Sequence, residues 1–175
     1  MAAGAERASV ADNVGMTRDA HSPADLTPQG RLDEGGIHDL LGYQLAQASI
    51  LTTEAFQTAV GKPLDMRKVE FTILQLVQQN APVTATKVAK ALAVTTPGVT
   101  IWLDRLEERG LLVRERGDVD RRTQNLSITR KGQTLVTSAL ALLRQADGEI
   151  LAHLSAGERH MLLELLQKVA RLRKR

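Results

Sequence analysis

The sequence predicts a mainly helical protein that carries one small β-hairpin, and three observations lead to this prediction. Apolar residues make up 43% of the 175-residue chain, but aromatic residues only 2%, a mixture of mostly Leu, Ala, Val and Ile that favours helix packing. Apolar residues recur at three- and four-residue spacing along most of the chain after residue 36. A helix, a glycine stop, a strand, a charged loop and a second strand follow one another between residues 96 and 128. That order is typical of a winged helix-turn-helix with flanking helices.

The N-terminal third contains a tail and then two helices. Residues 1–35 mix Ala, Asp, Arg, Pro and Gly without a period, so we expect a disordered tail. A first helix is expected at about 36–60, ended by Gly61 and Pro63. A second helix carries apolar residues from Val69 to Val77 and stops before Pro82.

The middle of the chain contains the helix-turn-helix signals. A short extended piece at Pro82 leads to Thr84, the expected cap of a brief helix. Thr96 followed by Pro97 starts the next helix, because the threonine oxygen accepts an unpaired N–H and an early proline loses no internal bond. Gly110 ends that helix by adopting the left-handed conformation. Strands are expected at 111–116 and 123–128.

Two further helices complete the domain, which we place at residues 36–173. Thr129 caps a long helix, and Ser155 and Glu158 form a capping box for the last one. The flanking helices, at about 36–60 and 130–173, have broad apolar faces. The winged helix-turn-helix at about 64–131, here called the reader, is too small to cover them. A second copy would cover them, so a homodimer is predicted.

Composition excludes several classes of protein. A net charge of +3 fits an anionic partner. The absence of cysteine rules out disulfides, thiolate metal sites and cysteine-based peroxide sensing. There is no signal-peptide layout and no run near the ~18–20 apolar residues of a membrane span, so we expect a cytoplasmic protein with no membrane partner. No chelating spacing, phosphate loop or nucleophile motif is present, so no metal, cofactor or enzymatic activity is expected.

Several segments resemble the MarR (multiple antibiotic resistance regulator) family. They are LDRLEERGLLVR at 103–114, DRR at 120–122, LSITRKG at 126–132 and LSAGER at 154–159. The resemblance covers roughly residues 37–172. It implies a homodimer of winged helix-turn-helix protomers that binds a pseudo-palindromic operator in double-stranded DNA. It also implies repression that a small phenolic or aromatic acid effector commonly relieves.

The helix that begins near Thr96 is the predicted recognition helix, and its start is the predicted DNA-reading surface. The residues at this start avoid the buried stripe of Val99, Leu103 and Leu106. Many relatives have arginines where this chain has Thr96 and Ile101. We therefore expect base recognition to depend on hydroxyl and apolar contacts and on DNA shape. The predicted residues are Thr95, Thr96, Pro97, Gly98, Thr100 and Ile101.

The loop between the strands is the predicted wing. By resemblance, Asp120 holds the guanidinium of Arg122 while Arg122 enters the minor groove, and Arg121 meets phosphate. A solvated surface ion pair is the alternative interpretation. Further candidates for phosphate contacts are Arg105, Thr84, Thr86 and Lys87.

By the same resemblance, an effector pocket lies between the dimerisation helices and the reader. Arg67 would pair with a carboxylate while rings stack nearby. The alternative is that the apolar members are core residues and Arg67 is solvated. The predicted pocket residues are His38, Tyr43, Met66, Arg67, Phe71 and Trp102.

Two hypotheses about function follow. The first is a ligand-responsive, homodimeric transcriptional regulator, acting as a repressor. The second is a helical ligand-binding or protein-interaction module that no longer binds DNA, an alternative left open by the missing arginines at Thr96 and Ile101.

Overall fold

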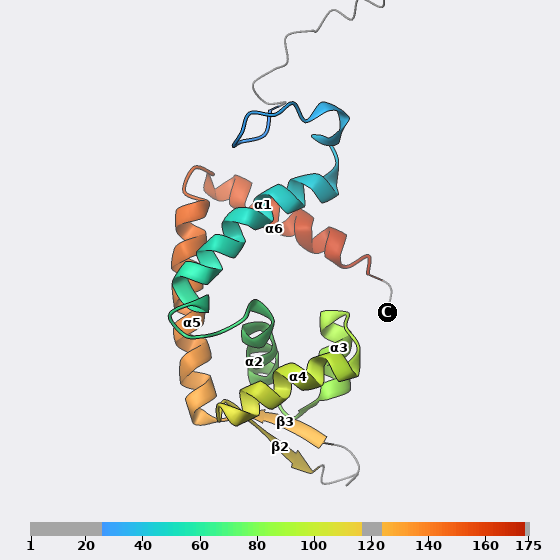
Figure 1. Ribbon diagram of the computed structural model, residues 1–175, viewed down its shortest axis with the longest axis vertical. Helices are drawn as coiled ribbons and strands as arrows, with labels where there is room; N and C mark the ends of the chain where they lie inside the picture. Colours follow the sequence, from blue (N-terminus) through green and yellow to red (C-terminus); the bar gives the residue numbers. More distant parts are fainter. Residues whose placement is uncertain (1–25, 117–123, 174–175) are drawn as a thin grey trace, which may run out of the picture. The chain divides into compact units, whose positions relative to one another are not determined.

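The computed structural model describes residues 26–116 and 124–173 (Figure 1). The chain forms two compact units, with the boundary after Gln47, inside the first long helix. The elements in chain order are a 3-10 helix (Gly35–Ile37), α1 (Leu41–Phe56), a π-helical turn (Gln57–Gly61), α2 (Lys68–Asn80), β1 (Val83–Thr84), α3 (Ala85–Leu92), α4 (Thr96–Glu108), β2 (Leu112–Arg116), β3 (Gln124–Ile128), α5 (Arg130–Ile150) and α6 (Ala156–Ala170). The predicted winged helix-turn-helix order is confirmed.

The first unit begins with a closed turn, although residues 26–35 belong to the predicted disordered tail. Leu26 and Asp33 form an antiparallel bridge, and the Thr27 hydroxyl accepts the Leu32 N–H at 2.9 Å. Gly30, with φ of 79°, supplies the left-handed residue that the turn needs. Local polar side chains therefore close a turn within the segment that composition assigns to a tail.

The second unit contains a three-stranded antiparallel sheet in the order β1–β3–β2. Leu126 in the middle strand pairs with Val83 on one side and with Arg114 on the other. The segment between α2 and α3 is thus tied to the hairpin that follows α4. This tie places the helix-turn-helix and the hairpin on one common core.

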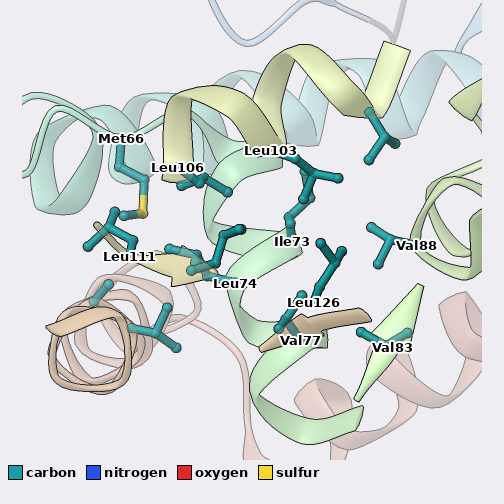
Figure 2. Close-up of a cluster of buried hydrophobic side chains, with 14 of the residues drawn as sticks. Met66, Ile73, Leu74, Val77, Val83, Val88, Leu103, Leu106, Leu111 and Leu126 are labelled. Atoms are coloured by element: carbon teal, nitrogen blue, oxygen red, sulfur yellow. The ribbon is translucent and has the colours of Figure 1, made fainter. Parts of the chain in front are cut away.

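The core packs α2 against α4, the sheet and α5 (Figure 2). The predicted buried stripe of α4 is confirmed, because Val99, Leu103 and Leu106 are all fully buried. They meet a matching stripe on α2, and Leu126 lies nearby (Figure 2). Burying such side chains contributes about 1.5–3 kcal/mol each. The buried apolar residues are Phe56, Val60, Met66, Ile73, Leu74, Val77, Val83, Val88, Ala89, Val99, Leu103, Leu106, Leu111, Leu112, Leu126, Val136 and Ala139.

Most helix boundaries match their predicted signals. The Thr129 hydroxyl accepts the Gly132 N–H at 3.0 Å, Ser155 and Glu158 form the expected capping box, and Gly110 has a φ of 66°. One cap is wrong by a residue. Thr95, and not Thr96, is the N-cap of α4, and its hydroxyl accepts the Gly98 N–H at 3.3 Å.

Two helices expose large apolar side chains. No residue of α6 is buried, and α1 buries only Phe56. No helix within the described ranges is long and apolar enough to cross a bilayer. The exposed residues are Leu41, Leu45, Ile50 and Leu51 on α1 and Met161, Leu162, Leu163, Leu165 and Val169 on α6.

Candidate nucleic-acid interface

The turn between α3 and α4 sets the direction of the recognition helix. Ala93 adopts the left-handed conformation with φ of 55°, and its N–H bonds the Lys90 carbonyl at 3.2 Å. Val94 closes the turn through the Ala89 carbonyl at 3.1 Å. The next residue, Thr95, is extended and caps α4. A two-helix reader is therefore built from local bonds and the buried stripes beneath it.

The first two turns of α4 present one continuous outward face. Pro97, Thr100 and Ile101 are all exposed, and their i, i+3, i+4 spacing places them side by side on the helix. Ile101 is 67% exposed. Thr96 and Gly98 are half-buried beside them. The structure thus brings the six predicted α4 residues together at one end of the helix.

Arg105 lies on the second half of α4 and is half-buried in ion pairs with two acidic residues of the protein, although the sequence predicts a phosphate contact. Its guanidinium donates to Asp65 Oδ2 at 2.9 Å and lies 3.4 Å from Glu70 Oε1. A phosphate contact would have to compete with both carboxylates. We therefore leave Arg105 out of the interface.

Glu70 is a functional neighbour that the sequence analysis does not identify. It is completely buried, and its second oxygen accepts the Arg67 backbone N–H at 2.9 Å, which closes the capping box of α2. A buried carboxylate needs such partners, because an unpaired one costs several kcal/mol. Glu70 thus links the start of α2 to Arg105 on the recognition helix.

Arg109 forms a second link to the same corner. Its guanidinium donates to the backbone carbonyls of Asp65 at 2.6 Å and Leu64 at 2.8 Å. Together, Arg105 and Arg109 bind the C-terminal end of α4 to the segment that joins α1 and α2.

Arg114, on β2, connects the hairpin to α4. It donates to Asp104 at 2.5 Å and to Glu107 at 2.9 Å. The single positive charge of Arg114 therefore offsets part of the negative charge of the two carboxylates on a helix that would face phosphates. Two acidic side chains near DNA would otherwise repel it.

The start of α3 presents the other predicted contacts. Thr84 accepts the Lys87 N–H at 3.3 Å as the N-cap, so its hydroxyl is already engaged. Thr86 and Lys87 are exposed in the first turn of the helix. A helix start with an exposed lysine is a suitable phosphate contact.

The predicted wing residues Asp120, Arg121 and Arg122 lie outside the described residues. The flanking strands are described and pair in register up to Arg116 and Gln124. The wing residues therefore belong to the connection between β2 and β3.

Four of the six predicted effector residues lie in the second unit, and the other two lie in the first. In the second unit, Met66 is buried in the core, and Phe71 packs against Phe56 with ring centroids 6.4 Å apart. Trp102 is half-buried against the same core, and Arg67 is exposed. For Met66, Phe71 and Trp102 these positions match the alternative interpretation of core packing.

The other two predicted residues lie in the first unit, where each has a local bond. The Tyr43 hydroxyl donates to Glu34 Oε1 at 2.8 Å, and this hydrogen bond raises the pKa of Tyr43. A ring nitrogen of His38 bonds the Gly35 carbonyl at 2.8 Å.

A cavity of about 300 Å³ lies between the end of α1 and α5. It has small apolar residues and two carboxylates in its lining, and none of the six predicted residues lines it. Its residues are Glu54, Ala55, Thr58, Ala59, Leu142, Gln145, Ala146, Glu149 and Ile150. Within the described ranges, no group of three or more His, Asp or Glu side chains is placed to hold a metal.

Comparison with known proteins identifies this arrangement. The model of the MarR family matches residues 67–123, which run from the start of α2 into the hairpin. CouR, a transcriptional repressor solved with a 23-mer DNA duplex, is 31% identical, with a TM-score of 0.74 over 79% of this chain and 98% of CouR. The chain belongs to the MarR family.

Other solved MarR-family structures agree in fold. MarR from E. coli, in its apo form, is 25% identical, with a TM-score of 0.64 over 74% of this chain and 96% of its own. CouR from Rhodococcus jostii RHA1 bound to p-coumaroyl-CoA is 25% identical, with a TM-score of 0.69 over 79% of this chain and 96% of its own. Each of these matched chains is covered almost completely.

Proposed function

We propose that this protein is a non-enzymatic, homodimeric transcriptional regulator that binds a pseudo-palindromic operator in double-stranded DNA and acts as a repressor in the cytoplasm. One observation carries the proposal. The N-terminal half of α4 projects Pro97, Thr100 and Ile101 outward from a helix-turn-helix whose opposite side is fully buried. A recognition helix presents this end to the edges of bases in the major groove.

Support for repression comes from CouR, which matches 79% of this chain. CouR is a transcriptional repressor that was solved on a DNA duplex. The alternative, a helical module that no longer binds DNA, has no specific support. The helix-turn-helix is complete, and Arg114 forms ion pairs with the acidic residues Asp104 and Glu107 of α4.

Homodimerisation is supported by the apolar residues left exposed on α1 and α6. Two copies related by a two-fold axis would cover them and would carry two recognition helices. Those helices would enter major grooves about one helical turn apart, roughly 34–36 Å along the DNA.

The contacts beside the recognition helix remain proposals of the same kind. Thr86 and Lys87 at the start of α3 would contact phosphate. In the wing, Asp120 would orient Arg122 in the minor groove, and Arg121 would contact phosphate.

A small aromatic or phenolic acid, or its thioester, is the proposed effector class. Relatives were solved with p-coumaroyl-CoA and, for the Mycobacterium tuberculosis family member, with p-aminosalicylic acid. Of the predicted pocket residues, Arg67 is exposed and suited to a carboxylate. A thermal-shift screen of aromatic acids tests this part, because a ligand of the folded dimer raises its Tm.

Fluorescence anisotropy tests the DNA-binding proposal. The full chain is titrated into a labelled duplex from the DNA upstream of its own gene and into a shuffled duplex of equal composition. We expect at least a hundred-fold preference, with an affinity that falls as salt rises because phosphate contacts release counterions. Equal affinity for the two duplexes would contradict sequence-specific regulation.

A further inference from the structure

The exposed end of the recognition helix lacks the groups that usually distinguish bases by hydrogen bonding. The segment Thr96–Trp102 contains no charged side chain and no Asn or Gln. Bidentate recognition of guanine needs Arg or Lys, and that of adenine needs Asn or Gln. The first two turns of α4 therefore offer hydroxyl and apolar groups only.

Two hydroxyl groups at this end of α4 already make a bond within the helix. Thr95 Oγ1 accepts the Gly98 N–H at 3.3 Å as the cap. Thr100 Oγ1 donates to the Thr96 carbonyl at 3.1 Å, a common bond for a threonine inside a helix. With its proton committed to the backbone, the exposed Thr100 offers its methyl group and an accepting oxygen.

No arginine of α4 is available to replace these groups. Arg105, 29% exposed, is bound to Asp65 and Glu70 at the other end of the helix. Arg109, just beyond the helix, is bound to two backbone carbonyls. The reading end of α4 is thus left with Ile101, 67% exposed, beside Thr100 and Pro97.

We propose that α4 recognises the 5-methyl group of thymine, with Ile101 and the Thr100 methyl as the contacting groups. The thymine methyl is the apolar group that the four bases display in the major groove, and it matches an apolar helix surface. A 5-methylcytosine at the same position would supply the same methyl. This inference rests on the proposed DNA-binding function and states which feature of the operator that function reads.

Replacing thymine with deoxyuridine tests the proposal without altering the protein. This change removes only the methyl group and preserves base pairing. Each thymine of the operator duplex is replaced in turn, at the matching positions of both half-sites, and the dissociation constant is measured by anisotropy. We expect at least one position to weaken binding about four-fold per half-site, as follows from about 0.8 kcal/mol per buried methyl, and so about sixteen-fold for the pair.

Protein variants then assign the methyl contact to residues. Ile101→Ala should weaken binding to the thymine operator and should leave little further loss on the deoxyuridine operator, as two partners in one contact require. Thr100→Val, which keeps an outward methyl, should remain sensitive to deoxyuridine. Thr100→Ser, which removes the methyl and keeps the hydroxyl, should lose part of that sensitivity. Circular dichroism and Tm confirm that each variant is folded.

The outcomes separate this inference from the proposed function. Selective binding that is equally strong on every deoxyuridine operator would overturn methyl recognition and leave DNA binding intact. An unchanged deoxyuridine effect in Ile101→Ala and Thr100→Ser would overturn the assignment to these side chains. An absence of selective binding to any duplex would overturn both.

Discussion

Substituting Gly132 by alanine tests how α5 is anchored to the reader. Gly132 is buried, is the third residue of α5, and donates its N–H to the Thr129 cap at 3.0 Å. An alanine Cβ would lie 2.1 Å from the Leu111 carbonyl oxygen and 2.8 Å from Ile128 Cγ1. That oxygen already accepts the Thr129 N–H at 3.1 Å. The start of α5 therefore packs directly against Leu111, which lies between α4 and β2.

Two effects of opposite sign compete in this substitution. Alanine is the better helix former, by about 1 kcal/mol. Relieving the contact requires a separation of about 1 Å between backbone segments. Overpacking of this kind costs about 1–3 kcal/mol, and each disturbed hydrogen bond costs about 0.5–1.5 kcal/mol more. The steric effect is larger, so we expect Gly132→Ala to reduce the free energy of unfolding by about 2–3 kcal/mol.

Urea unfolding at one fixed protomer concentration measures this difference, since the stability of a dimer depends on concentration. Gly148→Ala is the matched control, because Gly148 lies in the same helix and an added Cβ would meet nothing within 4 Å. The control should be unchanged or up to about 1 kcal/mol more stable. If Gly132→Ala were as stable as the unsubstituted protein, the close approach of α5 to Leu111 would be incorrect.

Three further outcomes are expected. The bond from the Ser155 N–H lowers the pKa of Glu158 below its ordinary value of 4.5, so its stabilisation of α6 is present above pH 4.5 and is lost as pH falls through the lower folded pKa. Glu158→Gln, which cannot ionise, should remove that contribution from urea midpoints between pH 3 and 7, and a profile identical to that of the unsubstituted protein would argue against the capping box. Arg109→Lys, which cannot bond both carbonyls, should lower stability by about 1–2 kcal/mol in the same assay, whereas no loss would count against the link. Arg122→Ala should weaken operator binding about ten-fold or more, in keeping with a minor-groove arginine, and unchanged affinity would reject its wing role.

The parts of the fold that depend on neighbouring residues could be predicted from the sequence. Caps such as Thr84, Thr129 and Ser155 act within three residues of themselves, and a buried stripe is a property of one helix. The error at Thr95 has the same origin. Two adjacent threonines precede Pro97, and a helix tolerates proline at either of its first two positions. Only the backbone conformation therefore decides which threonine is the N-cap.

Features that join distant residues could not be predicted in this way. Arg105 has the exposure pattern of a phosphate contact on its own helix, but its partner Asp65 lies forty residues earlier in the chain. The complete burial of Glu70 depends on the same meeting of α2 with α4. No local pattern distinguishes these side chains from ordinary solvated charges.

The surroundings of the candidate effector residues also could not be predicted from local sequence. Met66 and Phe71 are apolar residues near a helix start, and such residues can line a pocket or fill a core. The core of the second unit occupies them. The cavity between α1 and α5 is instead lined largely by small residues such as Ala55 and Ala146, which carry no chemical signal in a sequence.

The position of α4 on DNA is the central claim, and tethered cleavage measures it most directly. Because the chain has no cysteine, Val94→Cys, in the turn just before α4 and 38% exposed, can carry a single iron–EDTA group, with the exposed His153→Cys, in the segment between α5 and α6, as the control. On the operator duplex, the Val94 conjugate should cut in two clusters about 10 base pairs apart, one in each half-site, and the control should not. Cleavage that is uniform along the duplex, or no stronger than that of the control, would contradict the account.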